Sequence, residues 1–117
     1  RQNQNLEKLK PVLDYINCNY NRAISLTEIS RIAMFDPKYF CRFFKKCMGT
    51  TFLEYQNGIR ISHIYQDLVS TNDKISVILE RHGFTNYKLF RKVFYKHFGA
   101  TPTEVRKNNS VYQKTTL

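Results

Sequence analysis

Apolar residues along much of the chain recur every three or four positions, which is the spacing of one face of an α-helix. The first such series is Leu6, Leu9, Leu13, Ile16 and Tyr20. A longer series runs from about residue 51 to 71, and its apolar face shifts partway along, as expected of a helix that packs against two different partners. Because no stretch alternates between apolar and polar residues as a strand does, the pattern predicts an all-α fold.

An internal repeat follows the first helix. With a shift of fifty residues, the coinciding identities are Phe40, Phe44, Lys46, Gly49, Thr51 and Glu54 with Phe90, Phe94, Lys96, Gly99, Thr101 and Glu104. With a shift of forty-nine, the coinciding apolar residues are Leu26, Ile29 and Phe35 with Ile75, Ile78 and Phe84. Two copies of one supersecondary unit explain this similarity.

The first copy carries the signals of a short helix, a turn and a second helix. Ser25 and Glu28 form a capping-box pattern for the short helix. Asp36 and Pro37 supply the cap and first turn of the second helix, which is expected to end before Gly49.

The second copy repeats this order with a weaker opening. Residues 75–82 are expected to form its short helix, which Gly83 ends, and Thr85 is expected to cap a helix over about residues 86–98. Because Lys74 stands in place of the capping serine, the short helix should depend more on packing than on its cap.

Further capping boxes at Thr51–Glu54 and Thr101–Glu104 predict the starts of a long helix and of a short last helix. The whole pattern predicts seven helices in two helix-turn-helix units, a homeodomain-like tandem joined by a long linker helix. The expected organisation is a disordered leader (1–5), a double helix-turn-helix domain (6–107) with a first unit (about 6–50), the linker (about 51–71) and a second unit (about 74–107), and a disordered tail (108–117).

The chain of 117 residues is strongly basic, with nineteen Lys and Arg residues against nine Asp and Glu and a net charge of +10. Such a field attracts polyanions, most often nucleic acid, although an anionic membrane surface would also be attracted. The sequence contains no run of about eighteen apolar residues that could span a membrane.

Composition offers little support for catalysis or metal binding. The three cysteines form no CxxC pair, which argues against a zinc site and a disulfide framework and favours reduced thiols in a cytoplasmic protein. The histidines share no ligand spacing with the cysteines, and neither a phosphate-binding loop nor a nucleophile motif is present. We therefore expect no enzyme activity, no metal and no cofactor; His97 is expected in the core, and His63 and His82 at the surface or its boundary.

Positive charge gathers on the outer face of the second helix in each copy. The inner stripes are Phe40, Phe43, Phe44 and Cys47 in the first copy and Phe90, Val93, Phe94 and His97 in the second. The outer faces are Lys38, Cys41, Arg42 and Lys45 in the first copy and Lys88, Arg91, Lys92 and Tyr95 in the second. In a helix-turn-helix unit the second helix enters the major groove of DNA, so this placement predicts double-stranded DNA as the partner.

The residue types suggest different roles on these faces. Arginine can bind the O6 and N7 of guanine with two hydrogen bonds, whereas lysine more often contacts phosphate. The candidates for base contacts are Arg42 and Arg91, followed by Lys38, Lys88 and Lys92. The candidates for phosphate contacts are Lys45, Lys46, Lys96, Thr85 and Asn86.

The linker length bears on how two units would share one duplex. A helix of about twenty residues is about 30 Å long, close to the ~34 Å of one DNA turn. It would place the two second helices in successive major-groove segments without requiring a palindromic site.

Over about residues 6–107 the sequence resembles the AraC/XylS family of bacterial transcription regulators. The motifs that carry the resemblance are Ser25–Ile29, Tyr39–Lys46, Tyr55, Arg60, Gly83–Phe84, Phe90–Gly99, Pro102, Val105 and Arg106. The resemblance implies seven helices, promoter binding by both units and contact with RNA polymerase. It also implies base contacts by Lys38, Cys41, Arg42, Lys88, Arg91 and Lys92.

Several positions depart from the family pattern, among them Ser30, Leu79 and Ile64, where alanine is common, and two bear on the turn and the candidate site. Met34 stands where the family often has glycine in the first turn, so this turn is expected to be strained or differently shaped. Cys41 replaces a polar residue often found at a base-contacting position.

Most family members carry an additional domain for ligand sensing, dimerisation or phosphorylation. The chain is therefore expected to be a monomeric fragment, with any dimerisation of a longer parent dependent on the missing domain, and to act in the cytoplasm at the nucleoid. The alternative is a basic module that binds RNA or an anionic membrane or protein surface without sequence readout. That alternative needs exposed apolar or stacking surfaces, whereas the aromatic residues here lie at core spacing.

Overall fold

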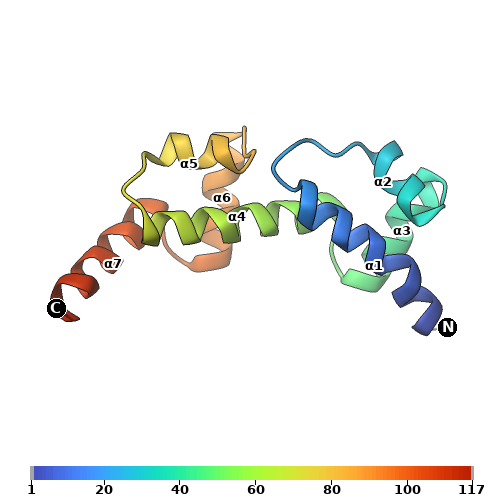
Figure 1. Cartoon of the computed structure of the whole chain (residues 1–117), viewed down its shortest axis with the longest axis horizontal. Helices are drawn as coiled ribbons and strands as arrows, with labels where there is room; N and C mark the ends of the chain where they lie inside the picture. The colour runs from blue at the N-terminus through green and yellow to red at the C-terminus, as the bar shows by residue number, and fades with distance from the viewer. Residues whose placement is uncertain (1, 117) are drawn as a thin grey trace. The chain divides into compact units, whose positions relative to one another are not determined.

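The computed structural model describes the backbone of residues 2–116 and the side chains of residues 4–109. This part of the chain forms seven α-helices and no strand, which confirms the predicted all-α fold (Figure 1). The helices are α1 (Gln2–Asn19), α2 (Leu26–Ala33), α3 (Pro37–Met48), α4 (Phe52–Ser70), α5 (Ile75–Arg81), α6 (Tyr87–Phe98) and α7 (Pro102–Thr116).

The chain divides into two compact units, Arg1–Ile59 and Arg60–Leu117, and each has its own hydrophobic core. The boundary lies within α4 rather than at either end of the expected linker. The first part of α4 packs Phe52 and Tyr55 against the first core, while its second part buries Ile64 and Leu68 in the second. The apolar face shifts along this helix because the helix packs against two different cores, as predicted.

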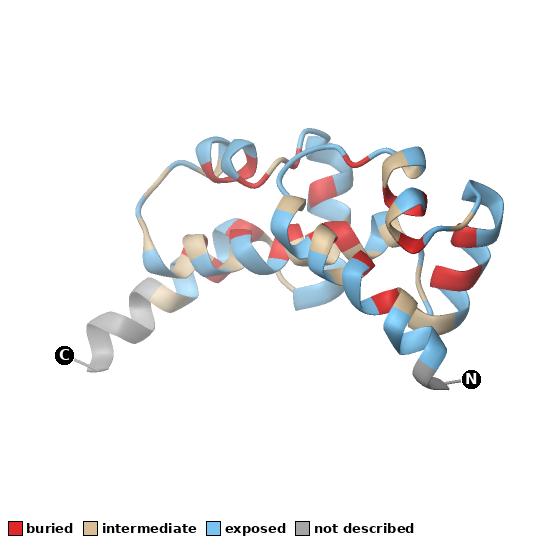
Figure 2. Ribbon diagram, turned by 45° about the vertical axis from the view of Figure 1, so that its right-hand side comes forward, coloured by how far each residue is buried: buried red, intermediate tan, exposed pale blue. Residues whose placement is uncertain are grey.

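The first unit buries apolar residues of α1, α2 and α3, and the first part of α4 covers them with partly buried side chains. Its fully buried side chains include Val12 and Ile16 of α1, Ile29 of α2 and Phe40 of α3 (Figure 2). Leu6, which the apolar spacing assigned to the inner face of α1, is instead 63% exposed. The buried face of α1 begins one turn later, at Leu9.

The end of α1 is joined to α4 by a buried amide. Gln56 is 1% exposed, and its Nε2 donates to the carbonyl oxygens of Tyr20 at 3.0 Å and Arg22 at 2.7 Å. Burial of an amide is costly unless it is hydrogen-bonded. Gln56 thus fixes the loop after α1, which leads into the helix-turn-helix motif.

The caps of the first unit follow the sequence prediction. The Glu28 amide donates to Ser25 Oγ at 3.1 Å and the Ser25 amide donates to Glu28 Oε1 at 2.8 Å, so the capping box of α2 is closed. Asp36 caps α3 by accepting from the amides of Lys38 and Tyr39. Two such caps fix where α2 and α3 begin.

The turn between α2 and α3 requires a left-handed backbone at Met34. Its φ is 61° and its ψ 37°, and the Phe35 amide donates to the Ser30 carbonyl at 3.0 Å. In the second copy Gly83 has a φ of 75°, and the Phe84 amide donates to the Leu79 carbonyl at the same distance. The two turns therefore have the same form, and the methionine is strained where the repeat has glycine.

Met34→Gly is expected to stabilise the first unit. A left-handed conformation costs a non-glycine residue about 1–2 kcal/mol, and the greater freedom of glycine in the unfolded chain offsets about 0.5–1 kcal/mol of this gain. The Met34 side chain is 80% exposed, so little packing is lost. We expect Tm to rise by roughly 2–5 °C in a thermal melt. Met34→Ala keeps the Cβ and should give no such gain; an equal rise for both variants would rule out backbone strain as the cause.

The second unit has the same plan with different caps. Phe90 and Phe94 of α6 pack with Ile78 of α5 and with Ile64 and Leu68 of α4 in its core. Lys74 precedes α5 without a side-chain cap, as its sequence predicted.

The cap of α6 differs from the sequence prediction. Its N-cap is Asn86, not Thr85, because Asn86 Oδ1 accepts from the Leu89 amide at 3.0 Å. Asparagine is a better N-cap than threonine, and here it also stands directly before the first helical residue.

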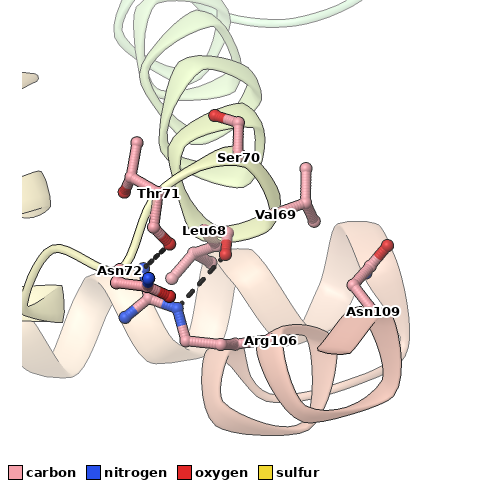
Figure 3. A pocket seen from close by; sticks show the side chains of 7 residues that line it. All are labelled: Leu68, Val69, Ser70, Thr71, Asn72, Arg106 and Asn109. Carbon is pink, nitrogen blue, oxygen red and sulfur yellow. Dashed lines mark hydrogen bonds between the residues drawn. The ribbon is translucent and has the colours of Figure 1, made fainter. Parts of the chain in front are cut away.

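The C-terminal end of α4 is held by Arg106 of α7, a residue of the family pattern (Figure 3). Its guanidinium donates to the carbonyl oxygens of Leu68 at 3.2 Å, Thr71 at 3.2 Å and Asp73 at 2.6 Å. These hydrogen bonds pair one carbonyl in the last turn of α4 and two in the loop that follows it, where a helix has no further amide to donate. The small hollow around Arg106 in Figure 3 therefore lies where Arg106 connects α7 to the end of α4, and its role is structural.

The expected disordered leader and tail are largely helical. Helix α1 begins at Gln2, and α7 continues to Thr116 with neither glycine nor proline after its first residue. Extending an existing helix is much easier than nucleating one, so polar residues that would not form a helix alone can prolong one. Arg1 and Leu117 lie outside the described residues.

Candidate nucleic-acid interface

Helix α3 separates an apolar inner face from a basic outer face. Phe40, Phe43 and Phe44 are buried and Cys47 is half-buried, as the helical spacing predicted. The outer residues are all exposed: Lys38, Cys41, Arg42, Lys45 and Lys46. The helix therefore presents its four cations to solvent, with one thiol among them.

Helix α6 repeats this arrangement. Phe90 and Phe94 are buried and Val93 is half-buried on its inner face. The outer residues are again all exposed: Lys88, Arg91, Lys92, Tyr95 and Lys96. The expected inner position of His97 is wrong.

His97 is exposed, and at the end of α6 the ring contacts are made by its neighbour Phe98, which is itself 37% exposed. The Phe98 ring lies 4.7 Å from that of Phe94 and 4.6 Å from that of Tyr65, centroid to centroid. The last turn of α6 thus contacts Tyr65 of α4 through the Phe98 ring, and the imidazole that helical spacing placed inside faces solvent.

Within the described residues, the cations on the two outer faces form no ion pair, although the charge of Lys45 contributes to lowering the pKa of Glu54. Neither α3 nor α6 contains an aspartate or glutamate. In the described part of the chain, the ion pairs involve other basic residues, namely Lys10, Arg22, Arg81 and His82. Two solvent-facing stripes of positive charge that no ion pair of the described residues neutralises are suited to a polyanion.

Thr85 and Asn86 lie exposed at the N-terminus of α6. The cap bond uses the Asn86 side-chain oxygen and leaves its amide nitrogen for another acceptor. An uncharged cap at a helix N-terminus favours a nearby phosphate, since the helix dipole is positive there. At α3 the corresponding cap is the negatively charged Asp36, so the two helix starts differ electrostatically.

Helix α2 is held in place by an ionic network. Glu28 accepts from Tyr15 Oη at 2.5 Å and from Arg22 Nη2 at 2.8 Å, and Arg22 also donates to Tyr15 Oη at 2.8 Å. Hydrogen bonds from Arg22, Tyr15 and the Ser25 amide lower the pKa of Glu28 to about 2. The network ties α1 and the following loop to the helix that supports α3.

The second unit has a corresponding network, of different composition. Asp67 of α4 accepts from Arg81 Nη1 at 2.7 Å and lies 2.7 Å from His82 Nε2, while Arg81 Nη2 donates to Asp73 at 2.8 Å. Burial raises the pKa of Asp67, but the hydrogen bonds with His82 and Arg81 outweigh it, so this pKa lies below its ordinary value.

His82 is buried, with 7% of its surface exposed, rather than at the surface or its boundary as expected from the sequence. It is separated from Asp67 by fifteen positions, and no local spacing indicated the pair.

Tyr87 was not among the residues that the sequence singled out. It lies exposed at the start of α6, and its ring centroid is 5.9 Å from the guanidinium carbon of Arg91. The two residues are one helical turn apart, a spacing that could have indicated the contact.

Other kinds of site find no support in the described residues. They contain no group of three or more His, Cys, Asp and Glu residues placed to hold a metal ion. No helix among them has the length and apolar character needed to cross a membrane. The cysteines Cys18, Cys41 and Cys47 are free thiols, and Cys41 lies on the outer face of α3.

The sequence is similar to those of helix-turn-helix transcription regulators. The family model of a helix-turn-helix domain matches residues 29–108. The lactose operon transcription activator of Staphylococcus xylosus is 32% identical over 108 residues, which are 92% of this chain and 39% of that protein. An HTH-type transcriptional regulator of Staphylococcus aureus is 31% identical over 103 residues, which are 87% of this chain and 14% of that protein. The chain thus spans well under half the length of these relatives.

Solved structures share the fold. A transcriptional regulator from Chromobacterium violaceum, described as containing an AraC-type DNA-binding domain, matches with a TM-score of 0.77 and 25% identity over 88% of this chain and 92% of that chain. The DNA-binding domain of AdpA, solved in complex with a target DNA, matches with a TM-score of 0.80 and 17% identity over 91% and 96% of the two chains. The sequence match and the shared fold agree with the two helix-turn-helix units described above. The chain belongs to the helix-turn-helix family of AraC-type DNA-binding domains.

Proposed function

We propose that the chain binds double-stranded DNA sequence-specifically, as the DNA-binding part of a bacterial transcription regulator. The observation that carries the proposal is the outer face of α3 and of α6, each without an acidic residue and each with exposed cations that form no ion pair among the described residues. In a helix-turn-helix unit this face enters the major groove. The relatives named as transcription regulators and the DNA complex of the same fold support the proposal.

The residues divide into two roles. Base contacts are proposed for Lys38, Cys41, Arg42, Lys88, Arg91 and Lys92, and phosphate contacts for Lys45, Lys46, Lys96, Thr85 and Asn86. Phosphate contacts set register and most of the salt dependence, whereas base contacts set sequence preference. With one basic helix in each unit, we propose that the two helices occupy successive major-groove segments of one duplex.

The rest of the proposal concerns the assembly at a promoter. The chain acts by binding rather than by catalysis. The 117-residue chain binds as a monomer, and it acts at the nucleoid in the cytoplasm. RNA polymerase is the proposed protein partner. Dimerisation of a longer protein would depend on regions beyond the matched domain.

The test is selection of bound sites from a random duplex library at about 0.15 M salt, near physiological ionic strength. We expect two short motifs about ten base pairs apart, one for each unit. Recovery of one motif would restrict base readout to a single unit. Absence of any enrichment, or equal binding to single-stranded RNA or anionic vesicles, would replace the proposal with a basic module that does not read sequence.

A further inference from the structure

Helices α3 and α6, which are proposed to enter the major groove, differ at the position of Arg91 in α6. Under the shift of fifty residues, Arg91 coincides with Cys41 and Tyr87 with Pro37. The side chains of Tyr87 and Arg91 contact each other, with 5.9 Å between the ring centroid and the guanidinium carbon. This distance is within the range of a cation–π interaction.

In the described part of the chain, the contact of the Arg91 guanidinium is with the Tyr87 ring. Within the described residues, Arg91 makes neither a hydrogen bond nor an ion pair, and α6 contains no carboxylate that could hold it. Both side chains are exposed, and 56% of the Tyr87 surface faces solvent. The guanidinium is therefore restrained by the ring and still open to a ligand.

Tyr87 is itself in a fixed place. It is the first residue of α6, directly after the N-cap Asn86. Its ring centroid lies 6.3 Å from that of Phe90, which is fully buried in the core of the second unit. An aromatic side chain has few rotamers to lose, so it can act as a support for a more flexible neighbour.

From this geometry we infer that Tyr87 is a positioning residue that orients Arg91 for base readout by the second unit. The inference rests on the proposed function and adds a residue to it. An arginine side chain loses much conformational freedom when it makes two hydrogen bonds to a guanine. Restraint of the guanidinium before binding reduces that loss, which strengthens the contact and the preference for its base.

Arg42 in the first unit has no such support. The residues four positions before and after it are Lys38 and Lys46, which repel it. Tyr39, three positions before it, has its ring 4.7 Å from that of Phe35, and the cation–π contacts of the described residues do not include Arg42. The second unit should consequently discriminate more sharply at the Arg91 base pair than the first unit does at the Arg42 base pair.

The experiment compares base preference of the whole chain with that of variants at Tyr87, by competition between the selected site and duplexes changed at single base pairs. Tyr87→Leu should lower discrimination at the Arg91 base pair by about two- to fivefold, the size of an exposed cation–π contact. Tyr87→Phe keeps the ring and should retain the discrimination. Leu89→Ala truncates another exposed apolar side chain of α6, one outside the basic outer face, and should leave this base pair unaffected.

A double-mutant cycle separates positioning from a general effect on the helix. In an Arg91→Ala background, Tyr87→Leu should no longer change discrimination at that base pair. The inference is overturned if Tyr87→Leu matches the wild type, if it acts equally without Arg91, or if Arg91→Ala weakens all sequences alike. A wild-type chain that prefers no sequence would instead overturn the proposed function, so the two failures are distinguishable.

Discussion

Phe40→Ala is expected to remove most of the folding stability of the first unit. Phe40 is fully buried, and its ring centroid lies 5.8 Å from that of Phe44 and 5.9 Å from that of Phe52. Truncation of a buried phenylalanine costs about 3–5 kcal/mol. A unit of this size has only about 3–9 kcal/mol in total, at about 0.05–0.15 kcal/mol per residue.

The expected result is a fall in Tm of more than about 12 °C in the melting of the first unit, followed by far-UV circular dichroism. The second unit has a separate core, so the amide NMR signals of residues such as Phe94 should stay at their native positions. Leu53→Ala, at a position that is 51% exposed, is the control and should change stability by less than about 0.5 kcal/mol. A Phe40→Ala chain that melts within two or three degrees of the wild type would contradict the assignment of the core.

The loss should be visible in DNA binding as well. If the two units bind separate segments, Phe40→Ala removes the motif contributed by α3 from the selected site and leaves the motif contributed by α6. The same variant thus links the core of one unit to one half of the recognised sequence.

Local signals in the sequence were sufficient to predict most of the helices. Capping boxes at Ser25, Thr51 and Thr101 are closed in the structure by reciprocal hydrogen bonds to glutamates three residues later. Such caps act within one helical turn, so their outcome does not depend on distant packing. The internal repeat then gave the order of the helices in the second unit.

Features set by tertiary contacts were not predictable in this way. His97, which helical spacing placed inside, is exposed, and at the end of α6 the contact with Tyr65 of α4 is made by Phe98, itself 37% exposed. The burial of His82 depends on Asp67, fifteen residues away. Periodicity ranks positions along one helix, but it cannot show which neighbour supplies a partner.

The sequence was sufficient to predict which residues form the exposed basic faces, but not the role of each residue in them. Each cation assigned to the outer faces of α3 and α6 is exposed, because amphipathic spacing determines which side of a packed helix meets solvent. The division into base and phosphate contacts depends on where a duplex lies, so those roles stay predictions.

Arg42→Ala and Lys45→Ala offer a direct test of that division on one helix. Both residues are exposed on the outer face of α3, and neither forms an ion pair in the described part of the chain. A guanidinium that bonds two acceptors of a guanine distinguishes bases, whereas an ammonium near a phosphate responds only to charge. We therefore expect Arg42→Ala to weaken binding to the selected site by about 1–3 kcal/mol and to relax preference at one base pair. Lys45→Ala should weaken all sequences alike and reduce the salt slope by about one.

The measurement is a salt titration of the affinity for the selected duplex and for duplexes changed at single base pairs. Arg42→Lys is the matched variant, because it keeps the charge and loses the two-pronged geometry of the guanidinium. It should keep the salt slope of the wild type and still lose preference at the Arg42 base pair. If Arg42→Lys instead retains full preference, or if Arg42→Ala weakens every duplex equally, Arg42 contacts phosphate. The first unit would then have only Lys38 and Cys41 left as candidates for base readout, and the sequence preference of the chain would rest mainly on α6.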